Sequence, residues 1–239
     1  MIDWLRRPAG DSTIEVAGRA LPIAIRRHPT ARRMTMRLAP DGSEIRLSIP
    51  RWGRTMDAVS FARERSDWLA AQLESLAPRV VIHDGACFPY RGASVRIAWS
   101  AGYPRTPELD GTILRVGGAD RALESRVRRW LEARAVELLT RDLADYCHAA
   151  GVVVPSLRLS RANRRWGSCA SDGTVRINWR LIMAPDPVRQ SVVAHEVAHL
   201  VHFDHGRAFH ALLARLYGPK LAEAERWLKS NGRALYAAF

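Results

Sequence analysis

The segment VVAHEVAHLVHFDHG, residues 192–206, constrains the fold of this chain more than any other feature. Its apolar residues recur at helical spacing, which predicts a helix with one buried face. Asp186 followed by Pro187 is typical of a helix start, with the aspartate as the N-cap. His195 and Glu196 fall within this apolar helix, where polar groups without partners are costly to bury. The fold must therefore provide partners for these side chains.

His195 and His199 are four residues apart and so share one face of the predicted helix. Two imidazoles in this arrangement suit a tetrahedral zinc ion, and Glu196 can deprotonate a water molecule at the metal. Residues 195–199 match the pattern HExxH, whose mechanism requires a helix. The less favoured interpretation is a pair of core histidines bonded to backbone carbonyls.

A catalytic zinc ion needs a third protein ligand and an open fourth position. His202 lies only three residues after His199, and three ligands from one straight helix hardly converge on one metal. His205 precedes Gly206, where the helix can end and the chain can turn back toward the metal. We therefore favour His205 over Glu223, which lies in a later predicted helix, and we expect one zinc ion per chain.

The metzincin class has the pattern HExxHxxGxxH followed by a methionine turn. In this chain His202 stands at the glycine position, and the last methionine, Met183, precedes the motif. A metzincin is therefore not expected, although the spacing of the histidines is compatible with one.

The first part of the chain is predicted to be rich in β-structure. Apolar residues alternate on both sides of Asp41-Gly42, a dipeptide that is a strong hairpin signal. Residues 55–76 carry apolar residues at helical spacing, and Pro78 ends the predicted helix. Short strand-like segments follow it. We expect a β-rich N-terminal module with one helix over residues 1–118.

The character of the sequence changes near residue 120. Residues 121–150 form a long amphipathic pattern, and Gly151 is suited to end that helix. Strand patterns and the histidine segment follow, and two further helices are predicted over residues 207–217 and 220–230. We expect an α+β protein in which residues 119–239 form a zincin-like catalytic domain of a helix, a small sheet and further helices.

The stretch TVRINWRLI, residues 174–182, is predicted to be a strand. As a sheet edge it would pair an extended peptide beside the metal. As an ordinary core strand it would bury the alternating apolar residues that begin with Val175 and Ile177. Asn178 is a candidate substrate-binding residue on this strand. Cys169, just before it, is not expected to be a nucleophile, because a lone cysteine without a base is usually inert.

A tetrahedral oxyanion would need a donor besides the metal. His210, Arg164 and Arg165 are the candidates, and the sequence does not choose among them. Arg161, Arg164 and Arg165 also form a basic cluster with Trp166. Such a cluster contacts nucleic acid in some proteins and is more often solvated surface.

The chain of 239 residues carries a formal net charge of +13, with Lys220 and Lys229 as the only lysines. This charge can indicate a nucleic-acid partner. The excess of arginine and alanine is also typical of a composition bias, so nucleic acid is possible but not favoured. The three cysteines form no CxxC pair. No apolar run is long enough to span a membrane and no secretory h-region is visible, so a cytoplasmic protein is expected.

Two blocks, NRRWGSCASDGTVRINWRLIMAP and VVAHEVAHLVHFDHGRAFHALL, resemble the YgjP-like metallopeptidase family, which is related to SprT and Wss-type peptidases. The resemblance extends to the N-terminal RRMTMRLAPDGSEIRLSIPRW. It implies that His195, His199 and His205 are zinc ligands and that Glu196 is the general base. His210 stands where the family often has tryptophan, and this difference leaves the ligand set unchanged.

Together these features predict a zinc-dependent metallopeptidase that acts on peptides or unfolded proteins. Two alternatives stay open. The same metal and base could hydrolyse a phosphoanhydride, as in a nucleotide pyrophosphatase, with arginines holding the phosphates. The zinc could instead be purely structural in a non-catalytic zinc-binding protein, and Glu196→Gln would then leave every function unchanged.

Overall fold

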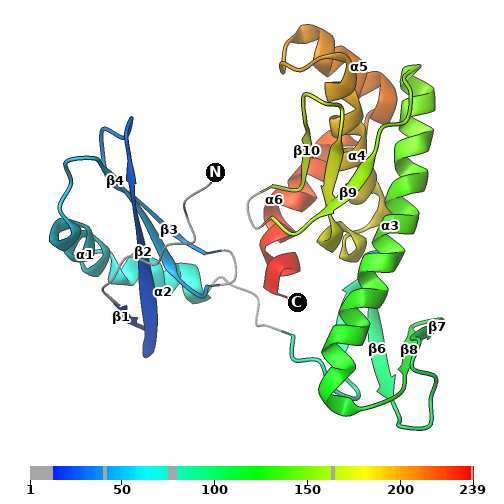
Figure 1. Cartoon of the computed structure of the whole chain (residues 1–239), viewed down its shortest axis with the longest axis horizontal. Coiled ribbons are helices and arrows are strands. Elements are labelled where there is room, and N and C mark those ends of the chain that lie inside the picture. The colour runs from blue at the N-terminus through cyan, green and yellow to red at the C-terminus, as the bar shows by residue number, and fades with distance from the viewer. Residues whose placement is uncertain (1–12, 40–41, 75–79, 163–164, 238) are drawn as a thin grey trace. The chain divides into compact units, whose positions relative to one another are not determined.

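The structure is a computed structural model that describes residues 13–39, 42–74, 80–162, 165–237 and 239 (Figure 1). It is an α+β protein, as expected, and it forms two compact units, Met1–Ala77 and Pro78–Phe239. The division lies upstream of the expected boundary between residues 118 and 119.

In the N-terminal unit, two helices pack against one face of a four-stranded sheet of order β1-β2-β4-β3. The expected hairpin is present, because β3 and β4 pair antiparallel from Leu38 opposite Ile45, although Asp41 at its tip lies outside the described residues. The elements are β1 (Thr13–Val16), β2 (Arg19–His28), β3 (Thr35–Leu38), β4 (Ile45–Pro50), α1 (Thr55–Arg63) and α2 (Ser66–Glu74).

The single helix expected over residues 55–76 is wrong. The chain forms α1 and α2 with a turn at Glu64 and Arg65 between them. Val59 of α1 and Leu69 of α2 are both buried in the same apolar cluster beneath the sheet. The turn lets both short helices place an apolar face on one sheet, which a single straight helix of that length would not do. Pro78, expected to end the helix, is outside the described residues.

The second unit begins with another four-stranded sheet, which explains why the boundary differs from the expected one. Val95, Ile97 and Leu114 of this sheet share a core with Val127 and Leu131 of the long helix α3. The sheet therefore belongs to the C-terminal unit and not to an N-terminal module. Its strands, in the order β5-β6-β8-β7, are β5 (Cys87–Tyr90), β6 (Ala93–Trp99), β7 (Glu108–Asp110) and β8 (Ile113–Val116).

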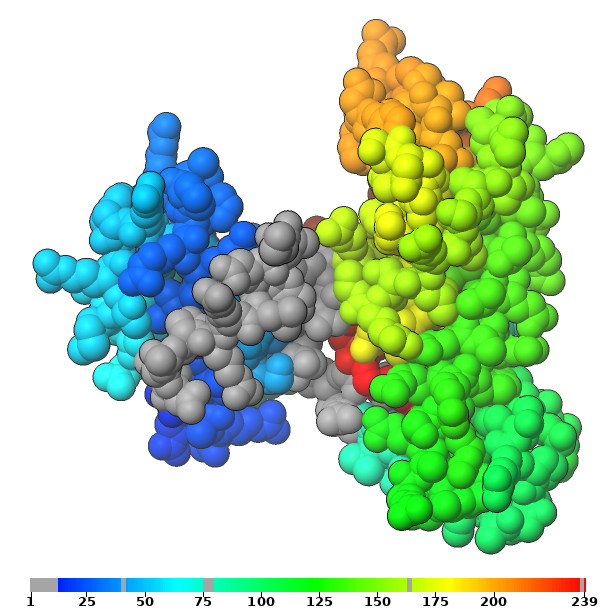
Figure 2. All heavy atoms as spheres, viewed as in Figure 1, coloured from blue at the N-terminus to red at the C-terminus, as the bar shows by residue number. Residues whose placement is uncertain are grey.

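Helix α3 (Leu123–Ala150) follows the short 3-10 turn η1 (Asp120–Ala122) and runs along the whole second unit (Figure 1). It ends as predicted at Gly151, which has the left-handed φ of 72° and donates its N–H to the carbonyls of the last helical turn. Figure 2 shows the orange atoms of the segment that contains α5 at one end of this unit, and the blue-green β5–β8 sheet at the other.

The rest of the second unit is a three-stranded sheet and three helices, which share a core with α3. The helix expected over residues 207–217 is present, and the last helix is longer than residues 220–230. The elements are β9 (Leu157–Ser160), β10 (Gly167–Cys169), β11 (Val175–Asn178), the 3-10 turn η2 (Trp179–Met183), α4 (Asp186–Val201), α5 (Arg207–Tyr217) and α6 (Leu221–Ala237).

The strand expected over residues 174–182 is shorter than predicted, and it is not an edge. It ends at Asn178, whose side-chain oxygen accepts the backbone N–H of Arg180 and begins the turn η2. In the sheet order β10-β11-β9, β11 is the central strand, paired with a neighbour on each side. An extended peptide could not add to β11, and β10 is an outer strand instead.

Among the described residues, no helix is long and apolar enough to cross a membrane.

Candidate metal centre

Helix α4 carries the centre, and ion pairs fix its first turn. Asp186 is the first helical residue and not the N-cap, a position that Pro185 occupies without a side-chain cap. The Asp186 carboxylate binds Arg91, with Nε 3.0 Å from Oδ1, and also Arg189. Arg189 is 1% exposed and also donates to Asp142 on α3, at 2.6 Å. The Asp186 carboxylate, which the sequence predicted to cap α4, therefore binds Arg91 and Arg189 instead.

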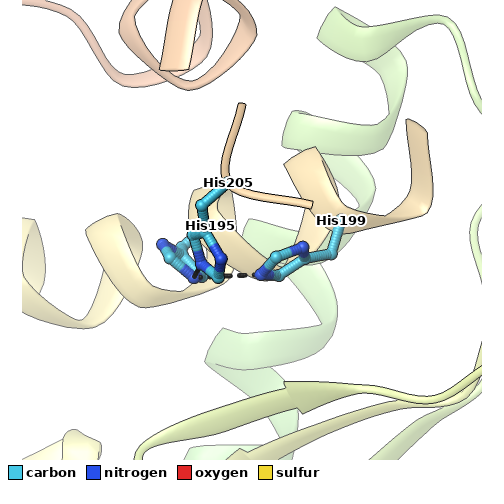
Figure 3. A group of neighbouring side chains, drawn as sticks. All are labelled: His195, His199 and His205. Carbon is cyan, nitrogen blue, oxygen red and sulfur yellow. Dashed lines mark hydrogen bonds between the residues drawn. The ribbon is translucent and has the colours of Figure 1, made fainter. Parts of the chain in front are cut away.

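Three histidines converge beyond the middle of this helix, as Figure 3 shows. Nε2 of His195 lies 3.2 Å from Nε2 of His199 and 3.3 Å from Nε2 of His205. His195 and His199 come from successive turns of α4, and His205 comes from the loop that follows. The predicted set of three is therefore brought together within eleven residues of chain.

His205 reaches the others by a route that differs in detail from the expected one. The helix ends at Val201, and His202 is already extended, with φ −132° and ψ 107°. The chain therefore turns before Gly206, which is the N-cap of α5. Asp204 helps to form the turn, because its Oδ1 accepts the N–H of Gly206 at 3.4 Å.

The surroundings of His195 and His199 suit metal binding. Burial, followed by the neighbouring histidines, lowers the pKa of His195 to about 4, so its ring is neutral at neutral pH. The Nδ1 of His199 lies 3.2 Å from the carbonyl oxygen of His202. A proton on Nδ1 donated to this carbonyl leaves the Nε2 lone pair free for a ligand bond.

The spacing of the nitrogens fits zinc. Ligand nitrogens bound tetrahedrally at about 2.0–2.1 Å from one zinc ion are roughly 3.3 Å apart, which matches the separations of both partners from His195. Within the described part of the chain, the group of side chains that could hold a metal ion consists of these three histidines. Glu223, the alternative ligand, is exposed in the first turn of α6 and is not among them.

An aromatic ring supports the three histidines. Phe209 of α5 is fully buried, and its ring centre lies 5.0 Å from that of His195, 4.6 Å from that of His199 and 4.7 Å from that of His205. One rigid side chain thus contacts every ligand ring. It limits the directions in which the imidazoles can turn.

Glu196, the residue after His195 in α4, has its carboxylate against Gly167 of strand β10. Burial raises the pKa of its carboxyl group to about 7, and a hydrogen bond from the backbone N–H of Cys169 and the charge of Arg165 act in the opposite direction. A Cβ on Gly167 would lie 2.3 Å from Oε1, so the carboxylate occupies space that only glycine leaves open. Oε2 is buried and finds no hydrogen-bond partner among the described residues.

The three candidate oxyanion donors differ in their positions relative to the centre. His210 is exposed, with its ring centre 6.5 Å from that of His205, beside the centre and outside the ligand set. Arg165 is exposed and near enough to influence Glu196. Arg164 falls outside the described residues.

Asn178 does not face a substrate. Its side chain is 0% exposed, and Nδ2 donates to the carbonyl of Ala162 at 2.7 Å. Its oxygen is used by Arg180, so the amide holds the loop before β10 in place. A substrate could not reach it without breaking these bonds.

Two members of the predicted basic cluster, Arg161 and Trp166, contact side chains of neighbouring helices. Arg161 binds Glu132 of α3 at 2.9 Å, and Trp166 stacks on Tyr236 of α6 with ring centres 4.6 Å apart. Both side chains already have partners within the second unit.

The sequence did not indicate three parts of the centre. Gly167 and the N–H of Cys169 form the seat of Glu196, and Phe209 underlies the histidines. The apolar spacing of α5 predicts that Phe209 is buried, but not what it contacts. No local pattern pairs a glycine on a strand with a carboxylate on a helix.

Three converging histidines, two of them on α4, together with a buried carboxylate whose Oε2 is unpaired among the described residues, are the groups that define the class of metal-dependent hydrolases. The family described as "YgjP-like, metallopeptidase domain" matches residues 32–231, and the chain belongs to that family. Comparison with curated proteins gives no match, and comparison with solved structures gives none either. Membership in this family makes the protein a metallopeptidase in general terms, with a metal ion and with peptides or proteins as substrates.

Proposed function

We propose that the protein is a zinc-dependent peptidase in which His195, His199 and His205 hold the metal and Glu196 is the general base. The observation that carries the proposal is the Glu196 carboxylate, which belongs to the residue directly after His195 in α4 and is buried with Oε2 unpaired among the described residues. A buried unpaired acceptor is costly, and a water molecule or substrate group in the centre would satisfy it.

The zinc ion would supply Lewis acidity, which lowers the pKa of water and polarises the scissile carbonyl. Glu196 supplies the proton transfers. Its Oε2 takes a proton from the attacking water and later gives it to the leaving amine. A carboxyl group whose pKa is raised by burial is suited to both steps, because it can exist in either form near neutral pH. The N–H of Cys169 keeps the carboxylate oriented while the proton moves.

An extended substrate peptide has a place beside this base. The hydrogen bonds Asn178 N–H to Trp166 O and Ala170 N–H to Thr174 O set the register of β10 on β11. In that register the backbone polar groups of Gly167 and Cys169 point away from β11. The N–H of Cys169 binds Glu196, so the N–H and C=O of Gly167 and the C=O of Cys169 are the groups that would pair with a peptide. We propose that β10, and not β11, aligns the peptide by strand addition next to Glu196.

Family membership favours the peptidase over the two alternatives. A phosphoanhydride hydrolase would need cations to hold the phosphates. Of the two arginines predicted as oxyanion donors, Arg165 is described and near Glu196, and Arg164 lies outside the described residues. A purely structural zinc site has no need of a buried base beside it.

Glu196→Gln in the full chain tests the proposal. The variant keeps the size of the side chain and removes its ability to take a proton. We expect about one zinc per chain by elemental analysis in both proteins, and hydrolysis of an unfolded protein slower by roughly 10²–10⁴-fold in the variant. Faster release of phosphate from a nucleoside triphosphate than of peptides would favour the phosphoanhydride hydrolase. Unchanged activity in the variant would rule out Glu196 as the base.

A further inference from the structure

One end of the N-terminal sheet gathers loops that are far apart in sequence. His28 at the end of β2 is opposite Pro50 at the end of β4, and Thr35 at the start of β3 is opposite Ser48. The β2–β3 loop and the β4–α1 loop therefore leave the sheet at the same end. Neither loop belongs to the metal centre, which lies in the other unit.

This end of the sheet is strongly basic. Residues 16–40 and residues 45–56 contain no acidic residue at all. The next carboxylate along the chain is Asp57, in the first turn of α1. We call the following group the basic end: six arginines, each exposed, which are Arg26, Arg27, Arg32, Arg33, Arg51 and Arg54.

The arginines of the basic end have no carboxylate partner among the described residues. Arg27 donates to neutral groups, the carbonyl of Gly53 at 3.4 Å and the hydroxyl of Thr55 at 3.1 Å. Arg46, further down the same sheet, is by contrast paired with Glu44 at 2.6 Å. The guanidinium groups of the basic end, which no carboxylate neutralises among the described residues, attract an anion far more than paired groups do.

A large aromatic side chain lies among these charges. Trp52, between Arg51 and Arg54, is 79% exposed, and Met56 one turn away is equally exposed. The bonds from Arg27 tie this loop to the end of β2. Exposed tryptophan is uncommon, because its large apolar surface is usually buried, and it is a stacking platform when it stands among arginines.

Composition bias sets how many arginines a chain has, but not where they lie. Helices α1 and α2, which cover one face of the sheet, carry four acidic residues and two arginines over residues 55–74. In the second unit, Arg161 and Trp166 have partners, as described above. The basic end is therefore a local feature of the fold and not only a consequence of the overall charge.

We propose that the basic end binds single-stranded nucleic acid, with the arginines on phosphates and a base stacked on Trp52. Guanidinium groups match phosphate oxygens in paired hydrogen bonds. A single strand offers free base faces to an aromatic ring, whereas a duplex does not. An acidic protein would satisfy the charges but gives no role to the exposed indole. The proposal does not depend on the peptidase activity.

Fluorescence anisotropy of a labelled thymidine strand of about 20 nucleotides, with the full chain at low salt, tests the proposal. Arg32→Ala with Arg33→Ala should weaken binding at least tenfold and lower the slope of log affinity against log salt by about 0.7 for each phosphate that the variant no longer binds. Trp52→Ala should weaken binding by roughly tenfold with the salt slope unchanged.

Matched controls separate the site from general charge. Arg128→Ala with Arg129→Ala removes the same charge from an exposed adjacent pair on α3, and Trp68→Ala removes a half-exposed tryptophan from α2. Both controls should bind as the unaltered protein does. Equal weakening by the two arginine pairs, or no effect of Trp52→Ala, would overturn the proposal. A polyglutamate peptide that competes as well as the strand would also overturn it, in favour of an acidic protein partner.

Discussion

The two chemical parts of the metal centre are built in different ways. The three histidines come from eleven consecutive residues, and their geometry needs little more than one helix and the loop after it. Glu196 belongs to the same helix, but its position depends on β10, a strand from another part of the chain. The difference teaches that metal binding and proton transfer should respond to different substitutions, although their residues are adjacent in sequence.

We expect the largest effect from a substitution in the histidine group, whose geometry depends on α4 and the loop after it. His205→Ala removes one of three ligands, and we expect zinc affinity to fall by more than about 100-fold, because loss of an outer supporting group alone costs 10–100-fold. His202→Ala is the matched control, since its carbonyl and not its ring contacts His199. Competition with a chromogenic chelator measures both variants. Full zinc retention by His205→Ala would mean that another residue completes the site.

A substitution at Gly167, which makes room for Glu196, should have the opposite effect and lower activity without lowering zinc affinity. Gly167→Ala would place a Cβ 2.3 Å from Oε1 of Glu196, so the carboxylate must move. We expect peptide hydrolysis to fall by about 100-fold, as a displacement near 1 Å can cause, while zinc affinity stays unchanged. Gly102→Ala, whose added Cβ has no neighbour closer than 3.9 Å, should leave both activity and metal binding intact.

A melting curve and a zinc titration distinguish a displaced base from a misfolded protein in Gly167→Ala. Loss of zinc binding together with activity would contradict the separation of the two parts. Full activity in Gly167→Ala would show that the seat does not position the base.

The same division explains how much the sequence could predict. HEVAH on an apolar helix identifies two candidate ligands, because residues four apart share a face whatever surrounds them. Gly151 likewise marks the end of α3, since a left-handed C-cap is a local requirement. Such features depend on neighbours along the chain, and the convergence of the three histidines and the end of α3 were both predicted correctly.

Features that depend on distant partners were not predicted. Alternating apolar residues suggested a strand through residue 182, but Asn178 turns the chain by bonding Arg180. Asp186 was expected to cap α4, but Arg91 and Arg189 bind its carboxylate instead. The chain divides upstream of the expected boundary because the β5–β8 sheet shares a core with α3, and this packing leaves no trace in local composition. In each case a contact across the fold overrode a local preference.

Phe209 combines a local and a packing feature. It is close in sequence to the three histidines, but it acts on them through packing. Phe209→Leu should lower zinc affinity about tenfold, the lower end of what loss of a supporting group costs. Leu213→Ala is the control, since this residue is buried in the same apolar cluster one turn along α5. We expect the control to lose stability, by about 2–5 kcal/mol, without a matching loss of zinc affinity.

Absorption spectra of the cobalt-substituted proteins sharpen the test of Phe209. A change of band shape in Phe209→Leu, with the control unchanged, would mean that the ring sets ligand geometry. If both variants lose affinity in proportion to their loss of stability, Phe209 is only a core residue.

The smallest expected effect concerns the start of α4, where non-local ion pairs hold the helix that carries the local site. Burial raises the pKa of the Asp186 carboxyl group, but hydrogen bonds from Arg91 and Arg189 outweigh it, and the net pKa is lowered. A lowered folded-state pKa gives stability that is fully present above the unfolded value of about 3.9 and is lost as the pH falls through the folded value. Asp186→Asn should therefore lower the free energy of unfolding by about 1 kcal/mol at pH 7 and by less below about pH 4.

Urea unfolding at both pH values measures this change. Asp110→Asn is the control, because Asp110 pairs with Arg115 on the surface and should contribute less. An equal cost at both pH values would mean that Asp186 holds the helix by shape and not by charge.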